Sequence, residues 1–299
     1  MVKTESFLLI VIAAFLIILV YVTGHITQFG PTEIFVNKTS RITLVGDIML
    51  GRSVMTKSLK VNDPQYPFLK VASELKKADL VFGNLESPLV EGCPKTDSGV
   101  IFCADPALVN GLSYANIGVV SLANNHLANY GAKGIADTKR ILTNAKIDYT
   151  GVGNLIVKQI RGTKFGFLGF NFVDKEPSSL ELKSITDSKK LVDVLIISVH
   201  WGKEYQAEAD ATQKTIAKKL IENGADIVVG HHPHWVQGEE TINGKRVYYS
   251  LGNFVFDQMW SEKTKQGLAV ELTFEGKNLT KEEKLPVKIT SIGQPEFVK

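Results

Sequence analysis

The chain has 299 residues, of which 44% are hydrophobic and 22% charged, a composition typical of packed globular proteins that excludes disorder, collagen and coiled coil. Its 34 Lys and Arg against 31 Asp and Glu leave a formal net charge of +3, too small for the basic footprint of a dedicated nucleic-acid binder. We therefore expect no nucleic-acid partner.

An uninterrupted apolar stretch near the N-terminus is just long enough to cross a bilayer. Its sixteen residues, 7–22, would rise about 24 Å as a helix, and the following residues can extend that span towards a ~30 Å hydrocarbon core. A cleavable signal peptide is the main alternative, although the small-x-small cleavage pattern is poor here. A buried core helix would need apolar surroundings on every face. The sequence favours a short flank of residues 1–6 and an uncleaved transmembrane anchor at 7–23.

The two cysteines, Cys93 and Cys103, lie in one polar segment with nine residues between them. If bridged, they would close a surface loop and stabilise the fold by roughly 3 kcal/mol, and such a bond persists only in an oxidising compartment. Two free thiols are the alternative, and no CxxC motif is present. An anchor combined with a disulfide indicates a body on the extracytoplasmic side of the cell membrane.

The folded body is predicted to span residues 41–299, after a polar tether at 24–40. Short β-branched runs alternate there with stretches of helical period, which is typical of a layered α/β domain with parallel strands. Arg161-Gly162 and Asn243-Gly244 predict tight turns between strands. Strands are expected at 42–45, 80–82, 117–122, 192–199, 226–229, 246–250, 268–274 and 287–292, and helices at 67–77, 106–115, 134–145 and 212–223. The pattern predicts two stacked sheets flanked by helices, with a β-rich C-terminal end.

Histidines gather where predicted strands end. Five of the six follow such strands: His126, His200, His231, His232 and His234. Because the carboxyl ends of parallel strands open on a shared crevice, these side chains can meet in space. Three imidazoles within four residues have little structural use and indicate metal binding. Carboxylate, amide and imidazole ligands without thiolate suit Mn²⁺, Zn²⁺ or Fe.

The chain order of these residues, with Asp47 and Glu86 ahead of the histidines, resembles the calcineurin-like metallophosphoesterases. It is more similar still to the CapA family, the poly-γ-glutamate capsule-biosynthesis proteins with a metallophosphatase-like domain. The resemblance spans residues 44–257 and is carried by the segments LVGDIMLGR, FGNLESPL, SLANNHLANYGAKGI, ISVHWGKEY, GADIVVGHHPHW and YSLGNFVFD. It implies a four-layer αββα sandwich, which membrane-anchored family members place outside the cell.

By the same resemblance, the domain holds two divalent metal ions. Paired ions can activate a water molecule and neutralise charge on a phosphoryl oxygen. His126 would act beside them as an acid or transition-state donor. Arg52 would grip an anionic oxygen, unless it is an ordinary surface charge. The implied metal ligands are Asp47 and His234 for the first ion, Asn125, His200 and His232 for the second, and Glu86 between the two.

Three positions depart from the phosphoesterase pattern. Met49 stands where Asp-x-His would place a histidine, Glu86 stands where an aspartate is usual, and Leu127 replaces the acid after the catalytic histidine. These departures fit the CapA pattern and favour metal binding over ordinary phosphatase turnover. Further loop residues are expected to shape the pocket, unless the tryptophans simply cap the core: Trp201, Glu204, Tyr205, Trp235 and Asn253.

The sequence therefore predicts a membrane-anchored, CapA-like protein that helps to synthesise or export a poly-γ-glutamate-type polymer, together with other subunits of a synthase or export complex. A metal-dependent hydrolase acting on an anionic polymer or a phosphoester is the implied activity. Two alternatives remain: an extracytoplasmic metal-dependent phosphoesterase unrelated to capsule, and a non-catalytic assembly subunit. The chain has no P-loop, dinucleotide fingerprint or Gly-x-Ser-x-Gly elbow.

Overall fold

The computed structural model describes residues 39–298. The predicted flank, anchor and nearly all of the tether, residues 1–38, lie outside the described residues and stay predictions. Within residues 39–298, no helix combines the length and the apolar character needed to span a membrane. The first strand begins at Thr39, two residues ahead of the predicted start of the body.

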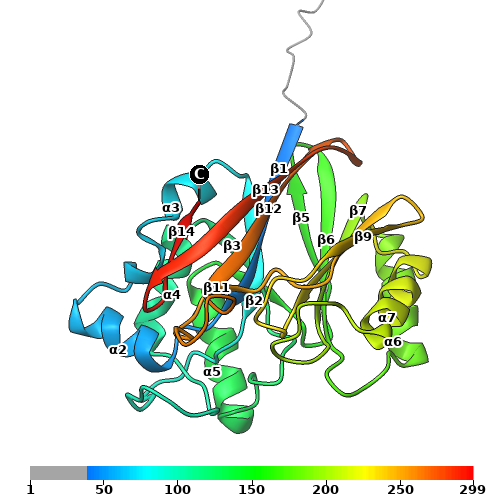
Figure 1. Ribbon diagram of the computed structural model, residues 1–299. Helices are drawn as coiled ribbons and strands as arrows, with labels where there is room; N and C mark the ends of the chain where they lie inside the picture. The colour runs from blue at the N-terminus through cyan, green and yellow to red at the C-terminus, as the bar shows by residue number, and fades with distance from the viewer. Residues whose placement is uncertain (1–38, 299) are drawn as a thin grey trace, which may run out of the picture. The chain divides into compact units, whose positions relative to one another are not determined.

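The first of two β-sheets combines early and late parts of the chain (Figure 1). Its strands are β1 (Thr39–Ile48), β2 (Leu80–Leu85), β3 (Ile117–Ser121), β4 (Asp148–Thr150), β11 (Asn253–Val255), β12 (Gln266–Glu275), β13 (Asn278–Ser291) and β14 (Gln294–Phe297). The order is β14-β13-β12-β1-β2-β3-β4, and β11 also pairs with β1. The strands from β1 to β4 run parallel, whereas β12, β13 and β14 add to them as an antiparallel meander.

The second sheet is formed by the middle of the chain. Its strands are β5 (Ile156–Ile160), β6 (Thr163–Asn171), β7 (Val194–His200), β8 (Ile227–His231), β9 (Glu239–Ile242) and β10 (Lys245–Tyr248), in the order β5-β6-β7-β8-β10-β9. The four inner strands are parallel, and each edge strand joins its neighbour as an antiparallel hairpin. Arg161-Gly162 and Asn243-Gly244 form the two hairpin turns with positive φ at every position, which confirms both turn predictions.

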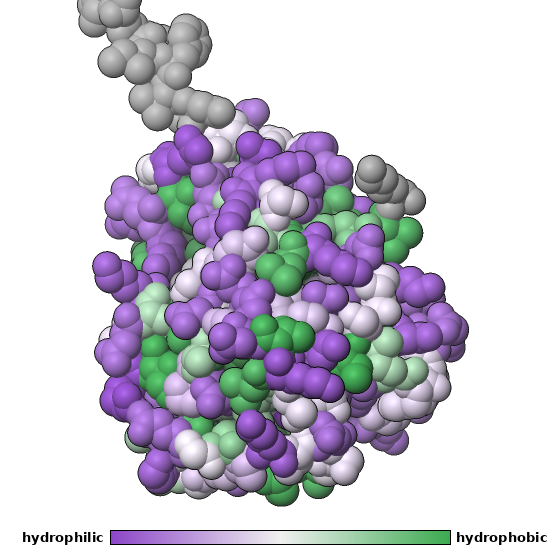
Figure 2. Space-filling view, turned by 90° about the vertical axis from the view of Figure 1, so that its left-hand side faces the viewer, coloured by the Kyte–Doolittle hydropathy of each residue, from purple (hydrophilic) through white to green (hydrophobic). Residues whose placement is uncertain are grey.

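Helices cover the two outer faces of the paired sheets (Figure 1). On one side lie α2 (Arg52–Lys60), α3 (Ala72–Leu75), α4 (Val109–Tyr114) and α5 (Gly131–Asn144), and on the other α6 (Ser179–Lys189) and α7 (Ala211–Glu222). The molecular face on the side of the first group is mostly hydrophilic, with apolar residues in small separate patches (Figure 2). Such scattered apolar residues are normal on a solvent-facing surface.

The alternation of side chains along each strand produces these layers. In β1, Ile42 and Leu44 are buried between the two sheets, whereas Val45 lies in the core beneath α2, α4 and α5. In β7, Ile196 faces the space between the sheets and Leu195 packs towards α6 and α7. Successive residues of a strand point to opposite faces, so both sheets are buried on both sides. The prediction of a mixed α/β fold with two stacked sheets is confirmed.

Some helices differ from the sequence prediction. Neither α2 nor α6 was expected, although Ser178 and Glu181 form a capping box at the start of α6. The helix predicted at 67–77 is instead a 3₁₀-helix (Tyr66–Phe68) followed by the single turn of α3. The amide groups of Phe68 and Val71 each donate to the carbonyl three residues earlier, which tightens the backbone there.

Asp226 ties together several elements of the second sheet. Its Oδ2 accepts hydrogen bonds from Lys189 Nζ at 2.6 Å and from the Leu195 amide at 2.8 Å, and its Oδ1 accepts from Lys245 Nζ at 2.6 Å. Burial on its own raises the pKa of Asp226, but the two lysines and the amide outweigh it and lower the pKa below its ordinary value.

We expect Asp226→Asn to lower the free energy of unfolding at pH 7 by about 1–3 kcal/mol, because two lysines lose their shared carboxylate. Since the folded-state pKa is depressed, this stabilisation is present above the unfolded-state pKa of about 3.9 and is lost as the pH falls through the lower folded value. Chemical denaturation at several pH values measures the effect. The matched control is Asp187→Asn, an exposed helix-surface pair, which should change stability little. Equal effects of the two variants would contradict the prediction.

Candidate metal centre

Strands of both sheets bring their polar ends together at one place. Asp47 is the penultimate residue of β1, Glu86 directly follows β2, His200 ends β7, and His232 and His234 follow β8. Asp47 and Glu86 are fully buried, and the three histidines are at most 6% exposed. The sequence-predicted ligands from four different strands are therefore close neighbours in the structure.

Gly46 allows the chain after β10 to approach the end of β1. A Cβ atom on Gly46 would lie 2.0 Å from the carbonyl oxygen of Gly252, so any other residue would collide with the backbone. The Gly252 carbonyl accepts a hydrogen bond from the Asp47 amide at 2.9 Å. This close contact places Asn253, whose side chain reaches His234, beside Asp47.

Asp47 is surrounded by donors on both carboxylate oxygens. Oδ1 accepts a hydrogen bond from Asn84 Nδ2 at 2.9 Å and lies 3.1 Å from His231 Nδ1. Oδ2 accepts from the His232 amide at 3.3 Å and lies 3.3 Å from His234 Nδ1. Burial on its own raises the pKa of Asp47, but the contacts with His231 and His234 outweigh it and hold the pKa well below its usual range. Asp47 is thus an ionised carboxylate.

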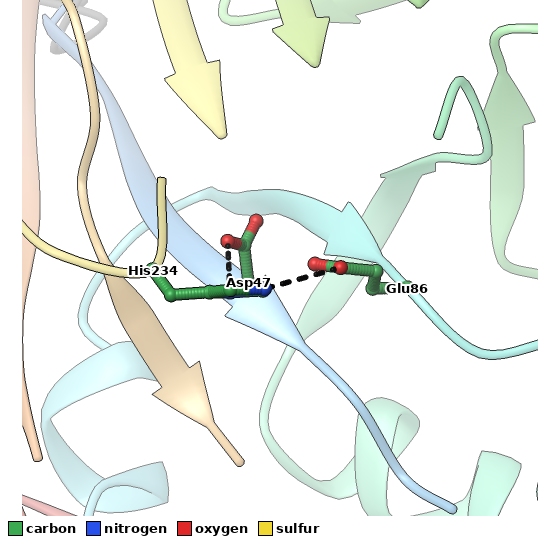
Figure 3. A group of neighbouring side chains, drawn as sticks. All are labelled: Asp47, Glu86 and His234. Carbon is green, nitrogen blue, oxygen red and sulfur yellow. Dashed lines mark ion pairs between the residues drawn. The ribbon is translucent and has the colours of Figure 1, made fainter. Parts of the chain in front are cut away.

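Glu86 has a buried carboxylate oxygen that makes no hydrogen bond within the described residues. Its Oε1 is buried and has no hydrogen-bond partner within residues 39–298. Three imidazole nitrogens face it at distances too long for hydrogen bonds: His234 Nε2 at 3.7 Å, His126 Nε2 at 3.8 Å and His200 Nε2 at 4.0 Å. Figure 3 shows the His234 ring between the carboxylates of Asp47 and Glu86. A buried oxygen left in this way needs a partner that the side chains do not supply.

A divalent metal ion fits this arrangement. Donor atoms of Asp47, Glu86 and His234 all lie within 4.8 Å of one another. Oxygen and imidazole ligands bind such ions at about 2.0–2.2 Å, so two donors on one ion lie about 4 Å apart or less. A cation would also offset the cost of burying two carboxylates side by side. The donor set is the carboxylate and imidazole set expected for Mn²⁺, Zn²⁺ or Fe.

The imidazoles of the cluster are in the protonation state that binds a cation, whereas the charged form of Glu86 needs a cation to stabilise it. Burial, together with the charges of Asp47 and Glu204, raises the pKa of Glu86 well above its ordinary value. Burial lowers the pKa of His200 well below its ordinary value, and burial with the neighbouring His234 lowers that of His232 to about 4. These imidazoles are therefore neutral at pH 7, which is the form that coordinates metals.

A second group of donors lies beside the first. Asn125 Oδ1 is 3.0 Å from His200 Nε2, and the rings of His200 and His232 are 4.7 Å apart between centroids. His232 Nδ1 is buried without a hydrogen-bond partner within the described part of the chain. His232 and His234 both have positive φ, at 95° and 59°, a conformation that costs non-glycine residues on the order of 1 kcal/mol or more. The loop after β8 is thus held in a strained form that presents both rings to the cluster.

His126 is oriented by a residue that the sequence did not single out. Its Nδ1 lies 3.0 Å from Asn129 Oδ1, which also accepts the Phe102 amide at 2.7 Å. An amide oxygen can only accept, so the proton of neutral His126 is on Nδ1, and Nε2 faces Glu86 with its lone pair. Asn129 therefore supplies the orienting partner that Leu127 cannot provide.

The segment between Cys93 and Cys103 contributes Phe102 to the surroundings of the site. The two cysteines are bridged, with 5.8 Å between their Cα atoms, which confirms the predicted disulfide over the alternative of two free thiols. Phe102 in this loop stacks on His126 with ring centroids 3.9 Å apart. Since Asn129 binds both residues, the disulfide-closed loop helps to fix the position of the His126 ring.

Arg52 is not a free surface charge, because most of its guanidinium donors are already bound by other parts of the protein. Its Nε and Nη2 donate to the Asp257 carboxylate, its Nη1 donates to the Gly99 carbonyl at 2.7 Å, and its guanidinium lies 4.6 Å from the Phe102 ring centroid. The side chain is 13% exposed. Arg52 thus fastens the disulfide loop to the segment after β11, and its proposed grip on a substrate oxygen stays a prediction.

Among the neighbouring residues, Asn84 belongs to the donor cluster, whereas Met49 and Trp201 lie in the hydrophobic core. Asn84 is a central one, since its Nδ2 contacts both Asp47 and Glu86 while its Oδ1 accepts from Asn124. Asn84 stands two residues before Glu86 in the FGNLESPL segment, where the sequence analysis singles out only Glu86. Met49 is fully buried in the hydrophobic core and accepts the Gly51 amide on its sulfur, so it takes no part in the donor cluster. Trp201 also packs in the core.

Comparison with known proteins gives a consistent family assignment. A family model described as bacterial capsule synthesis protein PGA_cap matches residues 41–258. The capsule biosynthesis protein CapA of Bacillus anthracis is 33% identical over 90% of this chain and 72% of its own length. The PGA biosynthesis protein CapA of Bacillus subtilis is 30% identical over 83% of this chain and 71% of its own length.

Solved structures share the fold at low identity. A hypothetical protein from Thermus thermophilus superimposes with a TM-score of 0.57 at 14% identity, over 83% of this chain and 99% of its own. A candidate 5′-nucleotidase from Staphylococcus aureus superimposes with a TM-score of 0.50 at 15% identity, over 83% of this chain and 54% of its own. At these identities the likeness concerns the α/β fold alone.

Proposed function

The chain belongs to the PGA_cap family of bacterial capsule synthesis proteins, and from that premise we propose that it helps to synthesise or export a poly-γ-glutamate-type capsule polymer. The names of the two CapA relatives, for capsule and for PGA biosynthesis, support this role. We further propose that residues 7–23 anchor the body on the extracytoplasmic side of the membrane. The Cys93–Cys103 disulfide supports that location, because such bonds persist in oxidising compartments.

We propose that the buried cluster is a metal centre acting on an anionic substrate. The observation that carries this proposal is Glu86 Oε1, buried without a partner within the described residues and faced by three imidazole nitrogens. Divalent ions bound there would activate water and neutralise negative charge on the substrate. By the resemblance to the calcineurin-like metallophosphoesterases, six side chains would hold two ions: Asp47, Glu86, Asn125, His200, His232 and His234.

The protein's own groups have separable tasks in this scheme. Asn129 keeps the His126 proton on Nδ1, so His126 Nε2 can accept a proton at the site and return it to a leaving group. Asn84 donates to both carboxylates and holds Asp47 and Glu86 side by side. Phe102 of the disulfide loop covers one face of the His126 ring, and Arg52 packs on Phe102. Hydrolysis or transfer at an acidic polymer is the reaction that these groups suit.

Elemental analysis of the purified full chain, combined with a panel of phosphodiesters and γ-linked glutamate oligomers, tests the proposal. We expect one to two equivalents of Mn, Zn or Fe, and cleavage or transfer of the γ-glutamyl substrate that falls at least ~100-fold in His200→Ala. Cleavage of phosphoesters alone would favour the phosphoesterase alternative. The fold shared with a candidate 5′-nucleotidase is the observation that favours this second function. Normal polymer export in cells carrying Asp47→Asn and His200→Ala would favour a non-catalytic assembly subunit.

A further inference from the structure

Three aromatic side chains form a cluster beside the candidate metal centre. Tyr205 lies 5.9 Å from His234 between ring centroids, 6.1 Å from Trp235 and 5.0 Å from Trp260, which meets it edge-on. Trp260 is 62% exposed. A tryptophan that is largely in solvent while packed next to buried polar residues is typical of a ligand-binding surface.

A chain of hydrogen bonds connects this aromatic cluster to the metal centre. Asn253 Oδ1 lies 3.0 Å from His234 Nδ1, and Asn253 Nδ2 donates to Gln258 Oε1 at 3.1 Å. Gln258 Nε2 in turn donates to the Tyr205 hydroxyl at 3.0 Å. Two side-chain amides thus hold Tyr205 at a fixed distance from a candidate metal ligand.

The backbone reinforces the same connection. Tyr205 has a φ of 60°, which is unfavourable for a bulky residue, and its amide donates to the Pro233 carbonyl at 2.8 Å. Pro233 lies between His232 and His234, so the loop that carries Tyr205 is fastened directly to the metal-binding loop. The local strain is retained where it positions an aromatic ring next to the site.

The cluster also offers a cation and a hydrogen-bond donor. Lys263 Nζ lies 4.4 Å from the centroid of the Trp235 ring. Lys263 has no carboxylate partner among residues 39–298, whereas the neighbouring Lys265 is paired with Glu262. Trp235 Nε1 is buried and has no acceptor within the same residues. A free ammonium group and a free indole N–H thus lie beside two aromatic faces.

These features match one kind of ligand. A polyglutamate chain alternates methylene groups, amide groups and carboxylates: the first pack on aromatic faces, the amide carbonyls accept an indole N–H, and the carboxylates pair with an ammonium group. We propose that Tyr205, Trp235, Trp260 and Lys263 form a subsite that binds the acidic polyamide next to the metal centre. This inference rests on the proposed function and names the residues that would select its substrate.

Calorimetric titration of the full chain with a short γ-linked glutamate oligomer tests the subsite. We expect Trp260→Ala and Lys263→Gln each to weaken binding roughly tenfold, as loss of an interface anchor usually does. Matched controls elsewhere on the surface are Leu180→Ala, an apolar residue that is 79% exposed, and Lys214→Gln, an exposed lysine without an ion pair in the described part of the chain. Both controls should bind like the unmodified protein. Metal content is measured in every variant.

The outcomes separate the subsite from the function on which it rests. If the unmodified protein binds the oligomer and the two subsite variants bind it equally well, the subsite is wrong and the polyglutamate function stands. If the unmodified protein does not bind the oligomer with Mn²⁺ or Zn²⁺ present, the polyglutamate function fails, and the subsite fails with it. Weakened binding accompanied by equal loss of metal in Trp260→Ala would also overturn the subsite, because the effect would then arise at the metal centre.

Discussion

Glu86→Gln is expected to lower the affinity for divalent metal at least ~100-fold and, in the same protein, to raise the stability of the metal-free form. The amide keeps the shape of Glu86 but removes the charge of a metal ligand. Without metal, that charge is unfavourable, because burial and the neighbouring Asp47 raise the pKa of Glu86 well above its ordinary value. Metal titration measures the first effect, and thermal unfolding in the presence of a chelator measures the second.

The pH dependence gives this prediction a definite sign. Between the unfolded-state pKa of about 4.3 and the raised folded value, the folded protein binds more protons than the unfolded one, so the stability contributed by Glu86 falls as the pH rises. The advantage of Glu86→Gln should therefore grow from acid towards neutral pH. Glu222→Gln, an exposed change on α7, is the matched control and should alter neither quantity. Unchanged metal affinity in Glu86→Gln would remove the basis for a metal at this position.

Replacing both cysteines, Cys93→Ser with Cys103→Ser, is expected to lower the free energy of unfolding by roughly 3 kcal/mol, because the open loop gains conformational freedom in the unfolded chain. The loop carries Phe102, which stacks on His126. Burial lowers the pKa of His126, so a looser Phe102 should let that pKa rise towards its ordinary value. Denaturant unfolding measures the stability, and NMR titration of the histidine ring measures the pKa.

Reduction of the unmodified protein provides an internal comparison for this variant. The reduced protein should match the double serine variant in both stability and His126 pKa, since each lacks only the bridge. An unchanged unfolding free energy together with an unchanged His126 pKa would show that the loop holds its position without the disulfide.

The strand-end ligands could be predicted because their signal is local. A run of β-branched and other apolar residues followed directly by His200, or after one glycine by Asp47, identifies a strand and the polar residue at its end. That four such ends meet depends on parallel strands, which the βαβ rhythm predicted. The helices on the outer faces of the sheets were harder to predict. The sequence analysis missed α6 because its apolar residues lack a clear helical period, although its capping box can be read in the sequence.

Partnerships across loops could not be predicted. Arg52 and Asp257 are 205 positions apart, and neither lies in a repeating pattern that would point to the other. The Asn129 amide oxygen binds both His126 and the amide of Phe102, a residue of the disulfide loop 27 positions earlier in the chain. Such contacts depend on how irregular segments cross, which periodicity and residue type do not encode. The anchor, the domain limits and the roles of individual ligands stay predictions.

The position of β1 has a consequence for how the protein is made. Thr39 pairs with Glu275, and Asp47 pairs with Asn253, so the first strand of the body stays half-unpaired until nearly the whole polypeptide has emerged. An unpaired strand of this kind can associate with other chains, so the nascent polypeptide would need protection during that interval. Binding of a cation at the proposed metal centre would then be among the last events of maturation and would distinguish finished molecules from prematurely terminated ones.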